Sequence, residues 1–324
     1  MSTSFGDVRH AVRWVLFLAG SLICCSAESA SADTLLRWKF NPGESLKYSM
    51  TMAMSQEMNV NGTPVKTNVD QIVDYTWTTG SVDSDGSVAM SQTMDRVRME
   101  MKGPQGAGGQ TSKYDSADEE KPTDAAGAMF AQMLGPMIGK AMTMRISSRG
   151  EISDFKAPEG MFEGIKKTPG MQQMGGIFSD QGLKQMVTQA MLKFPEKEIV
   201  KGDSWTSLLE MPNPAFGNQK VESTYTYAGS DTIDGRQAEA IDLKLNITFM
   251  AAKDSPTKVE LKDQSSKGTI HFDNAKGRLI DTESTMTMKM EITVGAMKFE
   301  SNTSVGVTLK RNEDKKSSSQ PAEK

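Results

Sequence analysis

Apolar and polar residues alternate with a period of two along much of the chain. In residues 45–54 every even position is apolar, and in residues 241–249 every odd position is apolar. This alternation is typical of antiparallel strands with one buried face, because successive side chains of a strand point to opposite faces of the sheet. We therefore expect a mainly β (α+β) fold built on a large curved antiparallel sheet or half-barrel of long strands.

Near the C-terminus the pattern also predicts the register in which two strands pair. Two alternating runs, residues 279–294 and 297–310, flank a Gly-Ala pair that suits a two-residue type II′ turn. Pairing outward from this turn places the following pairs on one face: Val294 with Met297, Ile292 with Phe299, Met290 with Ser301, Met288 with Thr303, and Met286 with Val305. Strands of this length extend about 50 Å and must twist and curl.

Three segments of the first half have counterparts in the second half, in the same order. The pairs are residues 42–46 with 201–205, residues 75–86 with 225–235, and residues 142–152 with 269–279. Two diverged copies of one β-meander, about 35–155 and 198–311, explain this order. Chance similarity between turn-rich β sequences is the alternative.

Three stretches interrupt the strand pattern. Residues 103–127 are polar and glycine-rich, which predicts a mobile loop. Residues 128–142 carry apolar side chains at helical spacing, broken by a Gly-Pro pair. A second helical region is predicted over residues 159–193, and its best part starts at Ser179, a favoured N-cap residue. We expect these inserted helices to pack on the sheet.

Residues 1–32 have the features of an export signal. An apolar run from Trp14 to Ile23 follows two arginines, and Ala30 and Ala32 are small enough for cleavage after residue 32. The run is too short for a stable membrane anchor. The sequence therefore predicts export to the periplasm or the cell exterior.

A lipidation site is the alternative interpretation of the same segment. Leu-Ile-Cys-Cys at 22–25 is similar to a lipobox that would lipidate Cys25, although Cys24 stands where Gly or Ala is usual. Peripheral membrane attachment is expected only if Cys25 is lipidated. In either case we expect one β-rich domain, residues 33–311, and a charged, disordered tail, residues 312–324.

Composition excludes several classes of site. The chain has 324 residues and a formal net charge of −4, and after residue 32 it has no cysteine and one histidine, His271. A disulfide framework, a thiolate nucleophile and a Cys/His zinc site are therefore excluded. The mild acidity argues against nucleic-acid binding.

The remaining candidates for chemistry are weak. His271 alternates with the apolar Ile270 and Phe272, so we expect it to point outward with Asp273 as a solvated histidine. The chain has no Gly-x-Ser-x-Gly motif for a nucleophilic serine. Residues 83–86, Asp-Ser-Asp-Gly, lack the later ligands of a calcium loop and predict a plain turn. We expect no catalytic, cofactor-binding or metal-binding residues and no cofactor, and a hydrolase ranks last among the hypotheses.

Methionine is strongly enriched, with 24 Met against 13 Leu after residue 32. Flexible thioethers favour an adaptable cavity for a lipophilic ligand. Cu(I) binding by alternating methionines is a second interpretation, although such sulfurs lie about 7 Å apart along a strand. The third interpretation is that Met replaces Leu in an ordinary core. If there is a cleft, the candidate lining residues are Met50, Met52, Met54, Met133, Met137, Met186, Met286, Met288 and Met290.

Three segments carry a resemblance to a known family. They are Pro-Gly-Glu-Ser-Leu-Lys-Tyr at 42–48, Phe-Pro-Glu-Lys-Glu-Ile-Val-Lys-Gly-Asp-Ser-Trp at 194–205, and Lys-Gly-Thr-Ile-His-Phe-Asp at 267–273. Together they resemble an uncharacterised family of exported bacterial β-rich proteins, often lipoproteins, with Gly-Asp-Ser-Trp as the most specific element. The resemblance implies no activity and no site residues. The expected sheet with helices is also similar, at the level of the fold alone, to lipoprotein carriers of the LolA/LolB type.

The sequence thus favours an exported, non-catalytic protein. Its expected partner is a lipophilic small molecule or a lipoprotein, bound in a Met-lined cleft between the curved sheet and the helices. The alternative is a structural or interaction protein of the cell envelope, with a filled core and no ligand.

Overall fold

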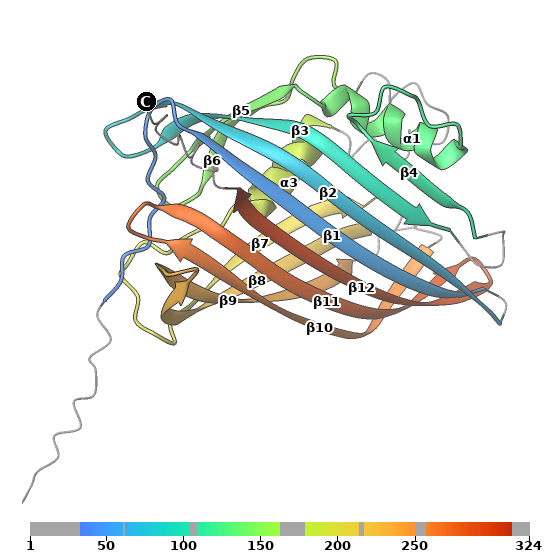
Figure 1. Cartoon of the computed structure of the whole chain (residues 1–324). Helices are drawn as coiled ribbons and strands as arrows, with labels where there is room; N and C mark the ends of the chain where they lie inside the picture. The colour runs from blue at the N-terminus through green and yellow to red at the C-terminus, as the bar shows by residue number, and fades with distance from the viewer. Residues whose placement is uncertain are drawn as a thin grey trace, which may run out of the picture. The chain divides into compact units, whose positions relative to one another are not determined.

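The structure, a computed structural model, describes residues 33–60, 62–103, 109–162, 179–213, 217–250 and 257–312. Within these residues, twelve strands form one open, curved antiparallel sheet (Figure 1). The predicted mainly β fold is therefore confirmed. The expected export signal with Cys25, and the tail after Asn312, lie outside the described residues.

The sheet consists of two meanders joined edge to edge. The first contains β1 (Ser45–Val60), β2 (Thr63–Val82), β3 (Val88–Lys102), β4 (Thr111–Asp115), β5 (Ala141–Ile146) and β6 (Ile152–Lys156). The second contains β7 (Ser204–Asn213), β8 (Gly217–Ile233), β9 (Arg236–Met250), β10 (Thr257–Asp273), β11 (Arg278–Val294) and β12 (Met297–Asn312). Pairing of β1 with β12 joins them, so the order is β6-β5-β3-β2-β1-β12-β11-β10-β9-β8-β7, with β4 also on β3.

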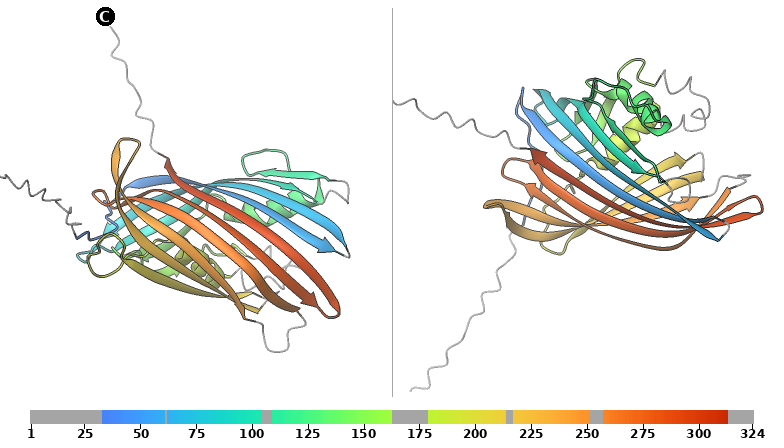
Figure 2. Two further views of the ribbon diagram at one scale, coloured as in Figure 1. Left: turned by 90° about the horizontal axis from the view of Figure 1, so that it is seen from below. Right: turned by 45° about the vertical axis from the view of Figure 1, so that its right-hand side comes forward.

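The predicted C-terminal hairpin is confirmed pair by pair. β11 and β12 pair in the expected register from Val294–Met297 through Met286–Val305. Gly295 has a φ of +61°, as the first position of a type II′ turn requires. These strands of 16 and 17 residues curl along their length, as Figure 2 shows.

Segments that match in the sequence occupy equivalent places in the two meanders. The Gly-acid-Ser turns precede β1 and β7, and the Asp-Gly turns follow β2 and β8. Gly150 and Gly277 lie in the β5–β6 and β10–β11 connections, both with positive φ. The topology thus contains two meanders, and their origin from a duplication stays a prediction.

The predicted loop at residues 103–127 is partly wrong, because residues 111–115 form β4. β5 pairs only with the first residues of β3, which leaves the edge of β3 open further along the strand. β4 pairs there, from Arg98 to Lys102. Arg96 supports the added strand through an ion pair with Asp115, with 2.5 Å between Nη2 and Oδ2.

The first helix also differs from its prediction. α1 (Ala125–Leu134) begins three residues earlier than expected, after Asp124, whose carboxylate accepts a hydrogen bond from the Gly127 amide. It ends where the Gly-Pro pair starts the 3-10 turn η1 (Gly135–Met137). Met142 lies in β5, because pairing with β3 outweighs the helical spacing of this residue.

The second helix, α3 (Asp180–Ala190), begins after the predicted N-cap. The Ser179 hydroxyl accepts a hydrogen bond from the Gly182 amide at 3.0 Å. The predicted range was too long at its C-terminal end, because Met191 is already extended. Residues 163–178 lie outside the described residues. α3 contacts both β6 and β7, and the Gln185 side chain donates to the Glu210 carbonyl at 3.2 Å. The helix therefore lies across the gap between the two edges of the sheet (Figure 1).

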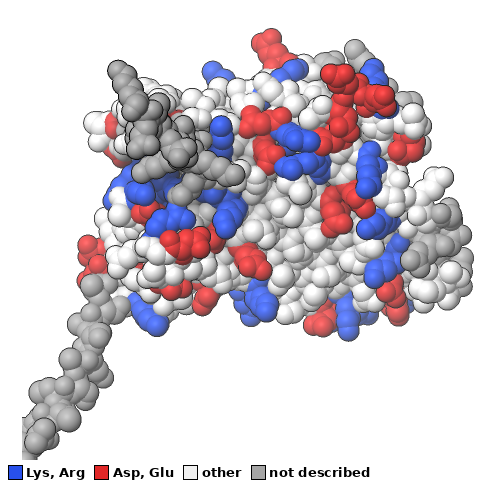
Figure 3. Space-filling view, in the orientation of Figure 1, with Lys and Arg blue, Asp and Glu red and all other residues white. Residues whose placement is uncertain are grey.

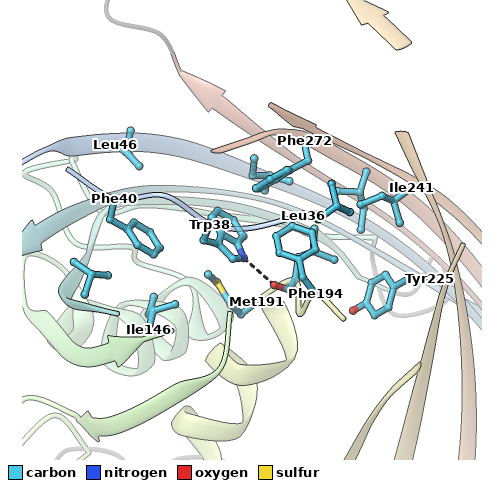
Figure 4. Close-up of a cluster of buried hydrophobic side chains, with 14 of the residues drawn as sticks. Leu36, Trp38, Phe40, Leu46, Ile146, Met191, Phe194, Tyr225, Ile241 and Phe272 are labelled. Carbon is cyan, nitrogen blue, oxygen red and sulfur yellow. Dashed lines mark hydrogen bonds between the residues drawn. The ribbon is translucent and has the colours of Figure 1, made fainter. Parts of the chain in front are cut away.

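One end of the curved sheet is filled by the N-terminal segment, residues 33–40, and by residues 191–199. Trp38 is 2 % exposed and packs against Phe194 and Phe272, and its indole donates to the Leu192 carbonyl at 2.9 Å (Figure 4). Because both meanders contribute to this core cluster, the two halves share one apolar interior.

Candidate functional site: a methionine-lined cavity

A cavity of about 360 Å³ lies between the first meander and the helices. Methionine contributes eight of its eighteen lining residues. The lining residues are Tyr48, Met50, Tyr75, Trp77, Met90, Gln92, Met94, Leu134, Met137, Met142, Met144, Ile146, Ile152, Leu183, Met186, Val187, Met191 and Leu309. We call this space the methionine cavity.

Strand pairing explains why these side chains share one wall. Residues that are paired across neighbouring strands point to the same face of a sheet. The cross-strand rows that contribute to the wall are Leu309–Met50, Tyr48–Tyr75–Met94, Trp77–Gln92–Met142 and Met90–Met144. A single face of β12, β1, β2, β3 and β5 therefore forms this side of the cavity.

The helices form the opposite side. α3 contributes Leu183, Met186 and Val187, and the end of α1 with η1 contributes Leu134 and Met137. Met186 is 39 % exposed, whereas the other lining residues are buried or half-buried. Met186 on α3 is therefore the most solvent-exposed residue of the wall.

The wall is electrically neutral. None of the eighteen lining residues is Asp, Glu, Lys, Arg or His. Burial raises the pKa of Tyr75 to about 12, and burial is also the main cause that raises the pKa of Tyr48 to about 12. Both phenols are thus uncharged at neutral pH. The Tyr48 hydroxyl donates a long hydrogen bond, 3.5 Å, to the Leu279 carbonyl.

The structure divides the nine candidate methionines into two groups. Met50, Met137 and Met186 line the methionine cavity. Six others do not line it: Met52, Met54, Met133, Met286, Met288 and Met290. Apart from Met133, which is half-buried in α1, these lie on the same sheet face as Met50 but further along the strands. There Met286 is buried in a separate cluster with Val221 and Ile247.

Fifteen of the eighteen residues that line the cavity were not among the sequence candidates. Five methionines were missed: Met90, Met94, Met142, Met144 and Met191. Tyr75, Trp77 and Gln92 were missed as well. Alternation in β2 and β3 could have placed these residues on a common face, but it could not indicate that the helices would cover this part of the sheet.

The expectation for His271 needs correction. Its side chain is 19 % exposed rather than fully solvated, and its Nδ1 lies 2.6 Å from Asp281 Oδ1. Asp273 is buried at the end of β10 and accepts a hydrogen bond from the Lys276 amide in the turn that follows. A bulge after His271 shifts the pairing of β10 with β11. The described residues contain no serine hydrogen-bonded to this histidine.

Residues 83–86 form the expected turn, in which the Gly86 amide donates to the Asp83 carbonyl at 3.0 Å. No cluster of His, Cys, Asp and Glu suited to a metal ion occurs among the residues described. In the same part of the chain, no helix has the length and apolar character that crossing a membrane would require. On the face seen in Figure 3, basic and acidic side chains are interspersed.

The Gly-Asp-Ser-Trp segment is architectural. The Gly202 amide donates to the Tyr227 carbonyl at 2.8 Å, and Asp203 accepts from the Val200 amide. The Trp205 indole donates to the Lys193 carbonyl at 2.7 Å. This turn therefore starts β7 and attaches it to the segment after α3. Its role as a family signature stays a prediction.

Comparison with known proteins gives a family and several distant likenesses. The sequence model of the family DUF6263, described as a family of unknown function, matches residues 85–279, which is more than half of the chain. This span runs from the β2–β3 turn into β11 and includes α1 and α3. No curated protein matches the sequence.

Similar solved structures are distant. Lipovitellin, in a structure of its lipid–protein interactions, is 12 % identical with a TM-score of 0.44; the match covers 85 % of this chain but only 26 % of lipovitellin. DynF from Micromonospora chersina is 8 % identical over 87 % of this chain and 86 % of its own, with a TM-score of 0.23. A putative outer membrane lipoprotein-sorting protein domain from Vibrio parahaemolyticus is 10 % identical over 82 % and 83 %, with a TM-score of 0.12. At these scores the likenesses carry no argument about function.

Proposed function

The chain belongs to the DUF6263 family of unknown function, and from this premise we propose that it binds a lipophilic small molecule in the methionine cavity without catalysing a reaction on it. The observation that carries the proposal is the wall itself. Eight methionines and no charged side chain surround about 360 Å³ of space.

Packing physics supports a ligand over an ordinary core. Close packing normally fills the space between a sheet and the helices that cover it, so an apolar recess of this size is unusual in a protein whose core serves only stability. Its volume lies within the range of small-molecule sites, roughly 300–1,000 Å³. The alternative function is that of an envelope protein with a filled core, and such a core would not contain this space.

The methionine content supports an adaptable site. Met has an unbranched side chain with three rotatable bonds, so its thioether can follow ligands of different shape. Leucine or isoleucine walls would hold one shape more rigidly. We therefore expect the cavity to accept a class of lipophiles rather than a single compound.

The first experiment measures binding of the neutral dye Nile red to the purified protein. Met186→Trp places a bulky ring at the solvent-exposed side of the cavity and should weaken binding about tenfold, as overpacking costs about 1–3 kcal/mol. Met297→Trp is the matched control, because Met297 is 56 % exposed at the start of β12 and lies outside the cavity lining. Val187→Trp repeats the test from a half-buried position of α3.

Mass spectrometry of a solvent extract identifies what the purified protein carries. A free lipid leaves with the solvent, whereas the acyl chain of a bound lipoprotein stays attached to a second polypeptide. The proposal is wrong if no lipophile is recovered and if Met186→Trp and Val187→Trp bind Nile red as the control variant does.

A further inference from the structure

Besides Tyr48, three of the lining side chains carry polar atoms, and these three lie together in the wall. Trp77 and Gln92 are directly paired across β2 and β3, and Tyr75 precedes Trp77 by two residues on the same face. Directly paired residues have Cβ atoms about 5 Å apart, and diagonal neighbours about 7–8 Å. All three line the methionine cavity. We call Tyr75, Trp77 and Gln92 the polar triplet.

The side chains of the polar triplet have no hydrogen-bond partner within the described part of the chain. This sets it apart from other interior polar groups, such as the Trp38 indole and the Tyr48 hydroxyl, which donate to backbone carbonyls. Tyr75, Trp77 and Gln92 are half-buried, and their polar atoms are not among the fully enclosed, unpaired ones. Their free donors and acceptors are therefore accessible from the cavity.

Unpaired polar groups of this kind favour a matching ligand group. A ligand that fills the cavity removes water from these groups, and a polar group that is then buried without a partner costs about 1–3 kcal/mol. A phenol, an indole N–H and a primary amide together offer donors and an acceptor. A ligand hydroxyl, ester or carbonyl could pair with them.

The lack of charged residues in the wall also restricts the charge that a ligand can carry. A carboxylate or ammonium inside the neutral wall would lose its hydration without gaining a counter-ion, which is strongly unfavourable. One cation lies next to a lining residue in the sheet: Arg311 of β12 is paired with Tyr48 of β1. Arg311 does not line the cavity and already has an interaction within the protein.

We infer that the methionine cavity selects uncharged lipophiles with one hydrogen-bonding group, such as a long-chain alcohol or ester, and that this group is bound by Tyr75, Trp77 and Gln92. This inference rests on the proposed function and names its ligand class. The apolar chain of the ligand lies along the methionines, and the polar triplet holds its head group inside the cavity.

The test compares three ligands of equal chain length, dodecanol, dodecane and dodecanoate, as competitors of Nile red. Dodecanol is expected to bind most tightly to the unmodified protein. Gln92→Leu and Tyr75→Phe keep most of the side-chain volume and should weaken dodecanol binding about threefold to tenfold, the range for one hydrogen bond. Dodecane binding should stay the same or tighten in both variants.

Gln71→Leu is the matched control, because Gln71 lies on the same face of β2 but outside the cavity lining. The inference is overturned if Gln92→Leu and Tyr75→Phe affect dodecanol and dodecane equally, which would mean that water satisfies the polar triplet. It is also overturned if dodecanoate binds most tightly and loses affinity in Arg311→Gln. Failure of the proposed function looks different, because none of the three competitors would then displace Nile red.

Discussion

Two glycines determine how closely the N-terminal segment approaches the hairpins of the two meanders. Gly150 and Gly277 have φ values of +86° and +64°, and a Cβ at either would lie 2.2 Å from a backbone atom, of Leu192 and Lys39 respectively. The Lys39 amide donates to the Gly277 carbonyl at 3.3 Å. At these positions glycine is required both by the left-handed backbone and by the contact.

Gly277→Ala should therefore destabilise the protein by more than the strain of a left-handed backbone alone would. Left-handed backbone costs a non-glycine residue about 1–2 kcal/mol, and displacement of Lys39 adds to this. Gly235→Ala is the control for strain, because Gly235 has a φ of +74° and a Cβ at this position would meet no atom within 4 Å. Urea unfolding measures the difference, and equal losses in the two variants would show that the close approach to Lys39 has no energetic weight.

At the scale of elements, β4 and α1 depend on two carboxylates at the edge of the first meander. Hydrogen bonds from Arg96 are the main cause that holds the pKa of Asp115 below its usual range. A hydrogen bond from Ser112, followed by one from the Gly127 amide, does the same for the pKa of Asp124, the N-cap of α1. Both carboxylates therefore stabilise this edge in their charged form.

Acidification should loosen β4 and α1 before the rest of the sheet. Carboxyls with a lowered folded-state pKa stabilise fully above the unfolded value, about 3.9 for Asp, and this stabilisation is lost as the pH falls through the lower folded value. Hydrogen exchange, corrected for its intrinsic pH dependence, should rise in β4 and α1 relative to β11 and β12 between about pH 5 and pH 3. In Asp115→Asn the pH dependence of β4 should decrease, and an unchanged profile would contradict this role of Asp115.

At the scale of the whole molecule, the two meanders share one sheet and one apolar core. β1 and β12 pair along most of their length, from Lys47–Asn312 to Asn59–Glu300. Trp38 packs on Trp77 from the first meander and on Phe272 from the second. Neither half therefore has a complete core without the other.

Trp38→Ala should destabilise both halves together, by about 3–5 kcal/mol. The slowest-exchanging amides report the free energy of global unfolding, and hydrogen exchange should show that this free energy falls by the same amount in β2 and in β9. Leu208→Ala is a suitable control, because Leu208 is 51 % exposed on β7 and its truncation should change stability by less than about 0.5 kcal/mol. Loss of stability in β2 alone would mean that the meanders fold independently.

Some features followed from the sequence because they depend on local geometry. The alternation of Met286, Met288 and Met290 with polar residues predicted strands, and the Gly295 turn predicted the register with β12. Ser179 predicted the start of α3 because its side chain can satisfy a free helical amide. These properties depend on periods of two or on the first turn of a helix, which neighbouring residues determine.

Only the tertiary structure decided where the methionines enclose space. Met50 and Met286 share one sheet face and look alike in the sequence, yet one lines the cavity and the other is buried with Val221 and Ile247. The difference arises because α3 and η1 cover one part of the curved sheet, and the curl of long strands brings β8 and β9 towards the other. Contacts between residues so far apart along the chain depend on the path of the whole sheet, and a local pattern of apolar residues contains no information about that path.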